Sequence, residues 1–143
     1  MKNSMEIKFK AIPENQAFAR NVVASFLLPL NPSVNELEDI KTAVNEAITN
    51  TIVHAYPEKA GDVTMKITTR ANNVEINISD NGVGIKDIER ALTPFYTSKP
   101  NEERSGMGFT VMESFMDKLE VKSDKRGVSV VMVKEILPMV AEM

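Results

Sequence analysis

Residues 33–56 read SVNELEDIKTAVNEAITNTIVHAY, and they form the clearest secondary-structure signal in the chain. Ser33 and Glu36 have the spacing of a capping box, in which both side chains accept hydrogen bonds at the start of a helix. Apolar residues then recur at helical spacing as far as Tyr56, which predicts one long amphipathic helix. Its apolar face consists of Leu37, Ile40, Val44, Ala47, Ile48, Thr51 and Ala55.

The same helix carries a carboxylate and a carboxamide one turn apart. Glu46 and Asn50 stand at positions i and i+4, which places both on one face of a helix. Such a pair can accept a proton and offer a hard oxygen ligand to a metal ion. An isolated Glu or Asn on a helix is more often only solvated, so the meaning of this pair depends on the segments around it.

Two segments with paired glycines follow along the chain. Residues 80–84 (DNGVG) come directly after a predicted strand, and residues 104–109 (RSGMGF) open a predicted helix. Asp80, at the strand end, can accept a hydrogen bond from a nucleotide base, and a helix that begins at glycines can offer N–H groups to phosphates. Asp-Asn-Gly is also a common turn sequence, so a structural role for Asp80 stays open. Together with Glu46 and Asn50, these segments predict ATP chemistry.

Outside the long helix, the chain predicts one strand, two further helices and two hairpins. Alternation over residues 5–11 predicts a half-buried strand, and residues 14–28 have helical spacing until a proline interrupts it. Hairpins are expected over residues 63–78 and 119–136, with a helix over residues 108–116 between them. The stripe expected to face the core from the first of these helices consists of Phe18, Val22, Val23, Phe26 and Leu27.

The order of the elements indicates the fold class. Strand, two helices, hairpin, loop, helix and hairpin lack the regular βαβ alternation of a doubly wound parallel sheet. We therefore predict an α+β fold, a two-layer α/β sandwich with a mixed, mainly antiparallel sheet. The stretch from Gly82 to Ser105 is rich in glycine, proline and polar residues, and a short helix is expected near residues 87–92. We expect this long loop to be a lid over the nucleotide.

Length and composition limit the function classes. The chain has 143 residues, which we expect to form a single ATP-binding domain over residues 1–143. A formal net charge of −3 argues against direct nucleic-acid binding, and the absence of cysteine excludes disulfides and thiolate metal sites. The sequence has neither a basic leader with an apolar core nor an uninterrupted apolar stretch of about 20 residues, so we expect no membrane segment. We expect a cytoplasmic protein.

The three segments, in this order, resemble the Bergerat-type ATP-binding fold of Hsp90, MutL, type II topoisomerases and histidine kinases. Residues 46–54 (EAITNTIVH) and 104–117 (RSGMGFTVMESFMD) are most similar to the anti-sigma-factor serine kinases of spore-forming bacteria. The resemblance covers nearly the whole chain. It implies a homodimer that binds an RNA polymerase sigma factor, phosphorylates a serine of an anti-anti-sigma protein with ATP and Mg²⁺, and so controls sporulation transcription.

The resemblance also implies a role for individual residues. Glu46 corresponds to the general base, Asn50 to the Mg²⁺ ligand, and Asp80 to the reader of the adenine amino group, which favours ATP over GTP. Arg20, on the polar side of the first helix, matches a position implicated in partner contact. The remaining residues expected to bind the nucleotide, ATP or ADP, are Gly82, Gly84, Thr97, Ser98, Lys99, Arg104, Ser105, Gly106, Met107, Gly108 and Ser129.

Two other functions stay open at this point. In one, the chain is a nucleotide-dependent protein-binding module, in which ATP orders the lid without productive phosphoryl transfer. In the other, it is an ATPase domain separated from a larger mechanical or sensory protein. A phospho-accepting role for His54, the only histidine, is disfavoured, because sensor kinases carry that residue on a separate dimerisation helix.

Overall fold

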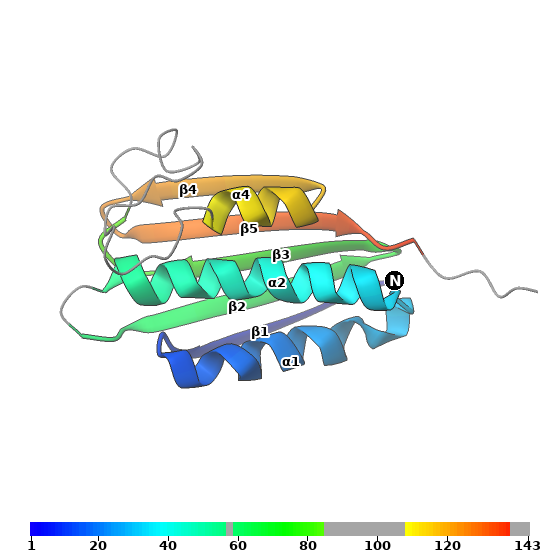
Figure 1. Cartoon of the computed structure of the whole chain (residues 1–143), viewed down its shortest axis with the longest axis horizontal. Helices are drawn as coiled ribbons and strands as arrows, with labels where there is room; N and C mark the ends of the chain where they lie inside the picture. Colours follow the sequence, from blue (N-terminus) through cyan, green and yellow to red (C-terminus); the bar gives the residue numbers. More distant parts are fainter. Residues whose placement is uncertain (57–58, 85–107, 138–143) are drawn as a thin grey trace, which may run out of the picture.

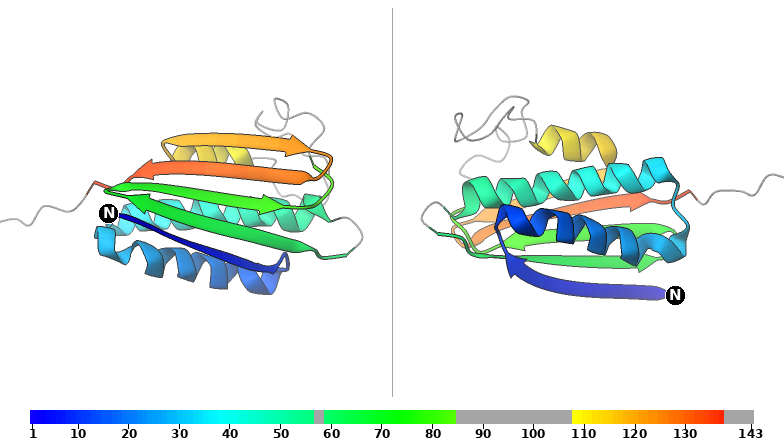
Figure 2. Two further views of the ribbon diagram at one scale, coloured as in Figure 1. Left: turned by 180° about the vertical axis from the view of Figure 1, so that it is seen from behind. Right: turned by 60° about the horizontal axis from the view of Figure 1, so that its bottom comes forward.

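Five strands form one antiparallel sheet, and the helices cover one of its faces (Figure 1 and Figure 2). The computed structural model describes residues 1–56, 59–84 and 108–137. The strands are β1 (Lys2–Lys10), β2 (Asp62–Arg70), β3 (Asn73–Asp80), β4 (Lys118–Asp124) and β5 (Gly127–Glu135). The α-helices are α1 (Gln16–Leu27), α2 (Val34–Asn50) and α4 (Gly108–Phe115), and the short helical turns are η1 (Pro13–Asn15), η2 (Leu28–Leu30) and η3 (Thr51–Ala55).

The strand order is β1-β2-β3-β5-β4, and every described pair is antiparallel. The predicted α+β two-layer sandwich is confirmed, while the parallel pairing that a mixed sheet needs is not among the described strands. Helix α2 lies between α1 and α4 along the helix layer (Figure 1). Strands β1 and β4 are the two edges of the sheet.

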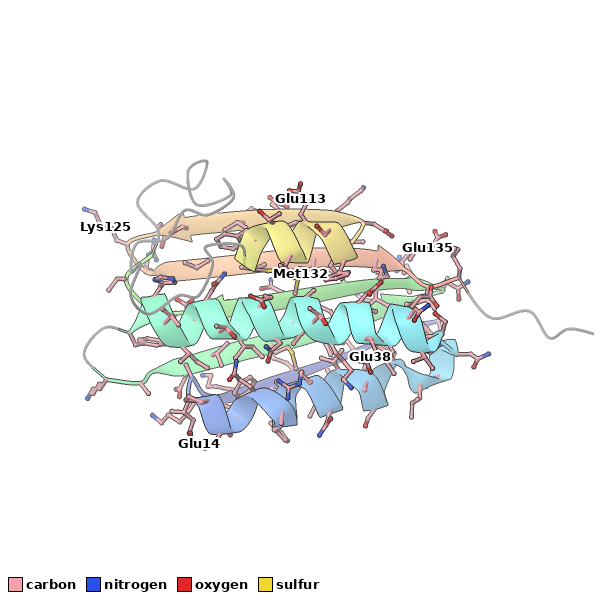
Figure 3. All side chains as sticks on the ribbon, viewed as in Figure 1. Glu14, Glu38, Glu113, Lys125, Met132 and Glu135 are labelled. Carbon is pink, nitrogen blue, oxygen red and sulfur yellow. The ribbon has the colours of Figure 1, made fainter. Side chains whose placement is uncertain are left out.

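The core lies between the sheet and the helices because side chains alternate along each strand. Met65 and Ile67 of β2 lie opposite Ile78 and Ile76 of β3, and all four are buried on the helix side. Figure 3 shows Met132 of β5 inside this layer. The helices contribute Ala19, Val23, Leu27, Ile40, Val44, Ala47, Ile48 and Met112 to the same core.

One predicted core residue is exposed instead. Phe18 of α1 keeps 51% of its surface accessible, and its ring packs edge-on against Phe9 of β1 with centroids 6.2 Å apart. The cause is the position of α1 over an edge strand, where no further described element covers its outer side. Val22 and Phe26 are partly buried, while Val23 and Leu27 are buried as predicted.

The architecture brings three chain segments to one end of the molecule. The carboxyl end of α2, the carboxyl end of β3 and the start of α4 all lie at the left in Figure 1. The predicted short helix over residues 87–92 and most of the predicted lid lie outside the described residues. Within the described ranges, no helix has the length and apolarity that crossing a membrane requires.

Candidate functional site

Helix α2 places the predicted acid-base residue and metal ligand at its carboxyl end. The helix begins with the predicted capping box, in which the Glu36 N–H donates to Ser33 Oγ at 3.0 Å and the Ser33 N–H donates to Glu36 Oε1 at 2.9 Å. Glu46 and Asn50 follow on one face, and both are half-buried. A fixed start and a continuous helix therefore aim these two side chains in the same direction.

The helix does not end at Asn50 but widens into a π-helical turn. Residues Thr51–Ala55 form this turn, named η3, directly after the candidate metal ligand. Short π-helical turns are rare and often occur at functional sites. The buried Thr51 hydroxyl lies 3.3 Å from the Ala47 carbonyl oxygen and 3.4 Å from Asp80 Oδ2, and it can donate to either. The turn thus joins the end of α2 to the end of β3.

Asp80 is the last residue of β3, and its side chain is held by three donors. Oδ1 accepts the N–H of Gly82 at 2.9 Å and that of Val128 at 3.2 Å, while Oδ2 faces the hydroxyl of Thr51. Asp80 is buried. Burial raises the pKa of its carboxyl group, and the three hydrogen bonds act in the opposite direction. The turn-capping role of Asp80 is therefore real, but Oδ2 keeps capacity to accept a further hydrogen bond.

The two glycines after Asp80 meet conditions that a side chain would violate. A β-carbon on Gly82 would lie 2.1 Å from the Ala55 carbonyl oxygen, because the chain here passes directly over the end of η3. Gly84 has φ +79°, a left-handed conformation that glycine adopts without steric cost. Gly82 thus keeps the backbone against the end of η3, while a β-carbon on Gly84 would lie 2.1 Å from the Asp124 carbonyl oxygen, at the turn between β4 and β5.

The start of α4 lies against the side chain of Asn50. A β-carbon on Gly108 would be 3.0 Å from Asn50 Oδ1 and 3.1 Å from Nδ2, so a side chain at this position would require Asn50 to move by a few tenths of an ångström. The positive end of the α4 dipole is therefore next to the candidate metal ligand. Residues far apart in the sequence meet here, and a phosphate group at the start of α4 would be beside Asn50.

Ser129 is not brought together with these residues. It lies on the sheet face opposite Asp80, because Val128 and Val130 on either side of it point toward the helices. Its hydroxyl donates to Asn77 Oδ1 at 3.1 Å on that outer face. The backbone N–H of Val128, and not the Ser129 hydroxyl, bonds to Asp80, and a contact of Ser129 with the nucleotide, direct or through water, stays a prediction.

A hollow lies next to Ser129. It has a volume of about 220 Å³, and the end of β3 and the β4–β5 hairpin line it, including Asp80, Val128 and Ser129. Ser79 and Ser129 are paired across β3 and β5, so they share the face that the helices leave uncovered. Asp80 therefore belongs both to the predicted site and to the lining of this hollow.

Arg20 is placed at the contact between the first two helices. Its guanidinium donates to Asn45 Oδ1 at 2.5 Å, and the side chain is half-buried. One turn earlier on α1, Gln16 Nε2 donates to Thr49 Oγ1 at 2.8 Å. Arg20 therefore holds α1 against the residue that precedes Glu46, in addition to any contact with a partner.

Several predicted site residues lie outside the described part of the chain: Thr97, Ser98, Lys99, Arg104, Ser105, Gly106 and Met107. Two contributors were not predicted as site residues, namely Thr51 and the backbone of Val128. The sequence could have indicated Thr51, because it is the one hydroxyl residue on the otherwise apolar stripe of its helix. No feature of the sequence could have indicated Val128, since nearly every residue type has the same backbone N–H.

The donor set suits a magnesium ion that is held mainly by phosphates. Mg²⁺ keeps several waters and takes one or two oxygens from the protein when it accompanies a nucleotide. Asn50 Oδ1, next to the start of α4, is such an oxygen. Among the described residues, no group of three or more His, Asp or Glu side chains gathers to bind a metal by itself.

The chain is similar in sequence to known proteins over most of its length. The histidine kinase-like ATPase domain family matches residues 9–134. The chain is 49% identical over 136 residues to the anti-sigma F factor of Clostridium acetobutylicum, covering 94% of this chain and 95% of the relative. It is 51% identical over 138 residues to the anti-sigma F factor of Oceanobacillus iheyensis, covering 95% of this chain and 94% of the relative.

Solved structures share the fold at low sequence identity. The RsbU and RsbW domains of a Mycobacterium tuberculosis protein match with a TM-score of 0.67 and 13% identity, covering 98% of this chain and 34% of that one. The catalytic domain of the histidine kinase ThkA matches with a TM-score of 0.54 and 14% identity, covering 94% of this chain and 99% of that one.

Proposed function

This chain belongs to the histidine kinase-like ATPase domain family and, within it, to the group of the anti-sigma F factors, and we propose that it is a protein-serine kinase as well as a sigma-factor antagonist. It binds an RNA polymerase sigma factor and uses Mg-ATP to phosphorylate a serine of an anti-anti-sigma protein. The phosphorylated antagonist no longer releases the sigma factor. These partners imply action in the cytoplasm during sporulation.

The observation that carries the proposal is the contact between Asn50 and the start of α4. It joins a candidate metal ligand to a helix N-terminus that suits phosphates, and the two are in close contact at Gly108. Asp80, joined to the same helix end through Thr51, is the corresponding acceptor for a base. A base reader, a phosphate site and a metal ligand together favour ATP over a simpler anion.

The residues divide the proposed reaction between them. Asp80 Oδ2 accepts a hydrogen bond from the adenine amino group, which guanine does not present at that place. The N-terminus of α4 binds phosphate oxygens, and Asn50 Oδ1 holds Mg²⁺, which neutralises phosphate charge when bound. Glu46, one turn before Asn50, takes the proton of the serine hydroxyl as its oxygen bonds to the γ-phosphorus. The bond from that phosphorus to the bridging oxygen breaks, and ADP leaves.

A homodimer through the β1 edge is part of the proposal. Strand β1 has β2 on one side and no described strand on the other. Met5, Ile7 and Phe9 along it are only half-buried, and the exposed Phe18 lies against Phe9. An unpaired strand bordered by apolar side chains favours pairing with another chain, and we assign a second copy of this protein to it.

The kinase activity is tested with purified protein, labelled ATP, Mg²⁺ and a candidate anti-anti-sigma protein. We expect phosphoserine on the antagonist. Glu46→Gln should slow the labelling by about 100-fold or more, because it removes the proton acceptor. Asn50→Ala should nearly abolish labelling by removing the metal ligand.

Matched controls lie on the same helix. Glu38→Gln and Asn35→Ala make the same chemical changes at exposed positions of α2, remote from its carboxyl end, and should keep wild-type labelling. Figure 3 shows Glu38 in the half of α2 that contains its start, away from its carboxyl end. A wild-type protein that binds ATP yet never labels the antagonist would contradict the kinase proposal and favour the nucleotide-dependent binding module.

A further inference from the structure

Tyr56 follows the π-helical turn η3, and its hydroxyl group contacts the start of β2 and the residue that follows β3. The phenol donates a hydrogen bond to the Asp62 carbonyl oxygen at 2.6 Å and accepts one from the Asn81 N–H at 2.9 Å. Asp62 is the first residue of β2, and Asn81 directly follows Asp80. The side chain therefore ties the start of one strand to the residue beside the proposed base reader.

Ala55, the residue before Tyr56, binds the same segment through its backbone. Its carbonyl oxygen accepts the Val83 N–H at 2.9 Å and leaves no space for a side chain on Gly82. The N–H of Gly82 itself donates to Asp80 Oδ1. Three consecutive N–H groups, those of residues 81–83, are thus bonded to Tyr56, Asp80 and Ala55 in turn.

The ring of Tyr56 has a matching place on the neighbouring loop. It packs on the backbone of Gly61, where a β-carbon would lie 2.3 Å from ring atoms Cε1 and Cζ. The ring is half-buried there. Packing on Gly61 therefore fixes the orientation of the Tyr56 ring, and this orientation points the hydroxyl group at the Asn81 N–H.

We propose that Tyr56 is a positioning residue for base recognition, because its hydroxyl holds residues 81–83 in the conformation that orients Asp80 toward adenine. This role rests on the proposed nucleotide-binding function. Tyr56 acts through Asp80 and needs no contact with the nucleotide itself. Groups held in place before binding cost less to order when the ligand arrives.

The phenol is in the required protonation state near neutral pH. Burial raises the pKa of Tyr56, and the neighbouring carboxylates of Asp80 and Asp62 raise it further, against the lowering effect of the Asn81 N–H. The hydroxyl therefore donates to one partner while it accepts from the other, which a phenylalanine cannot do.

Tyr56→Phe tests the role because it keeps the ring on Gly61 and removes only the hydroxyl. We expect ATP affinity to fall about tenfold, with a smaller preference for ATP over GTP, since two hydrogen bonds that hold the base reader are lost. In the nucleotide-free protein, amide hydrogen exchange at Asn81 should accelerate by a comparable factor. Calorimetric titration and exchange measured by NMR give these values.

Gly61→Ala reaches the same result by a different route. The added methyl group would displace the ring while leaving the phenol chemically intact. It should lower ATP affinity and the preference for ATP in the same direction as Tyr56→Phe. A double variant with Asp80→Asn should show less than additive loss, because Tyr56 acts through that carboxylate.

Asp117→Ala is the matched control. It removes a side-chain-to-backbone hydrogen bond, from the Glu135 N–H at 2.7 Å, at the opposite end of the sheet from the turn that carries Lys125 (Figure 3). It should leave ATP affinity, the ATP preference and Asn81 exchange unchanged. If Tyr56→Phe has the ATP affinity, the ATP preference and the Asn81 exchange rate of wild type, the positioning role alone is wrong. If the wild-type protein binds no ATP, the proposed function is wrong and the positioning role with it.

Discussion

Asp80 serves two purposes at the scale of the single residue because its two oxygens have different partners. Oδ1 accepts two backbone N–H groups and closes the turn, while Oδ2 faces one hydroxyl group. The alternative of a turn-capping Asp, which the Asp-Asn-Gly sequence left open, is thus correct without excluding base recognition. A carboxylate has enough acceptor capacity for both purposes.

The environment of Asp80 predicts how nucleotide affinity depends on pH. Burial raises its pKa above the ordinary value of 3.8, despite the hydrogen bonds from Gly82, Val128 and Thr51. As the pH falls, this carboxyl group takes up a proton before an ordinary Asp does and loses its capacity to accept from adenine. We expect ATP affinity, measured by calorimetric titration from pH 7 downward, to fall as the pH passes this raised pKa.

Asp80→Asn separates this effect from the titration of the nucleotide's own phosphates. At pH 7 the variant should bind ATP more weakly than wild type, by about tenfold or more, because a hydrogen bond to a charged group is lost. Its ATP affinity should also lack the part of the fall at low pH that protonation of Asp80 causes. Its free energy of unfolding should stay equal or rise. The folded protein binds the Asp80 proton more tightly than the unfolded chain, so ionised Asp80 costs stability above the raised pKa. Identical pH profiles of ATP affinity in both proteins would argue against Asp80 as the base reader.

At the scale of the element, α2 is held at both ends by different chemistry. Its carboxyl end joins β3 through Thr51, and its start joins the end of β5, where the Leu137 N–H donates to Glu36 Oε2 at 2.8 Å. Glu36 therefore closes the capping box and also anchors the chain that leaves β5. The helix that carries Glu46 and Asn50 cannot shift along its axis without breaking one of these contacts.

The capping box predicts a loss of stability in acid. Burial acts to raise the pKa of Glu36, but hydrogen bonds from Leu137 and Ser33 and the charge of Lys134 outweigh it and lower the pKa below the ordinary value of 4.5. A carboxylate with a lowered pKa stabilises the fold above the unfolded value, and this contribution is lost as the pH falls through the folded value. We expect Glu36→Gln to reduce that acid-dependent loss, measured by denaturant unfolding between pH 7 and pH 3.

Two further variants assign this effect to the cap. Ser33→Ala should lower the free energy of unfolding by about 0.5–2 kcal/mol at pH 7, because it removes the other half of the box. Glu38→Gln, at an exposed position of the same helix, should leave the pH dependence of wild type. An acid profile that is the same in Glu36→Gln as in wild type contradicts the assignment.

At the scale of the whole molecule, the two edge strands share one alternating pattern of exposed charges and half-buried apolar residues. The exposed charges are Lys118, Glu120, Lys122 and Asp124 on β4 and Lys2, Glu6, Lys8 and Lys10 on β1. What distinguishes the β1 edge is the exposed ring of Phe18, which packs against the half-buried Phe9. Helix α1 has no described neighbour beyond it, so a partner chain has access to this side.

The proposed dimer can be tested at this edge. Phe18→Glu places a charge on each copy in the apolar strip, and burying a Phe side chain contributes roughly 1.5–3 kcal/mol, so dimerisation should weaken by more than about tenfold. Sedimentation velocity measures the dimer fraction. Leu28→Glu, at a residue that is 64% exposed beyond the end of α1, is the control and should not change it. A dimer equally stable in Phe18→Glu would place the interface elsewhere.

What the sequence determined by itself is local. The capping box at Ser33, the alternation in the strands and the turns between them depend on residues a few positions apart, so their spacing indicates α2 and both hairpins nearly as observed. The glycines at positions 82 and 84 were also readable, because close approach and a positive φ are requirements of the backbone itself.

The tertiary structure decided which of these parts meet. Asn50 lies against Gly108 and Thr51 reaches Asp80 only because α2, β3 and α4 end at the same place in the fold. Pleating turned Ser129 away from Asp80. The edge position of α1 left Phe18 exposed, which helical periodicity alone could not indicate. Such contacts join residues far apart in the chain, and their geometry depends on how the sheet and the helices pack together. The order of residue types along the chain does not contain this information.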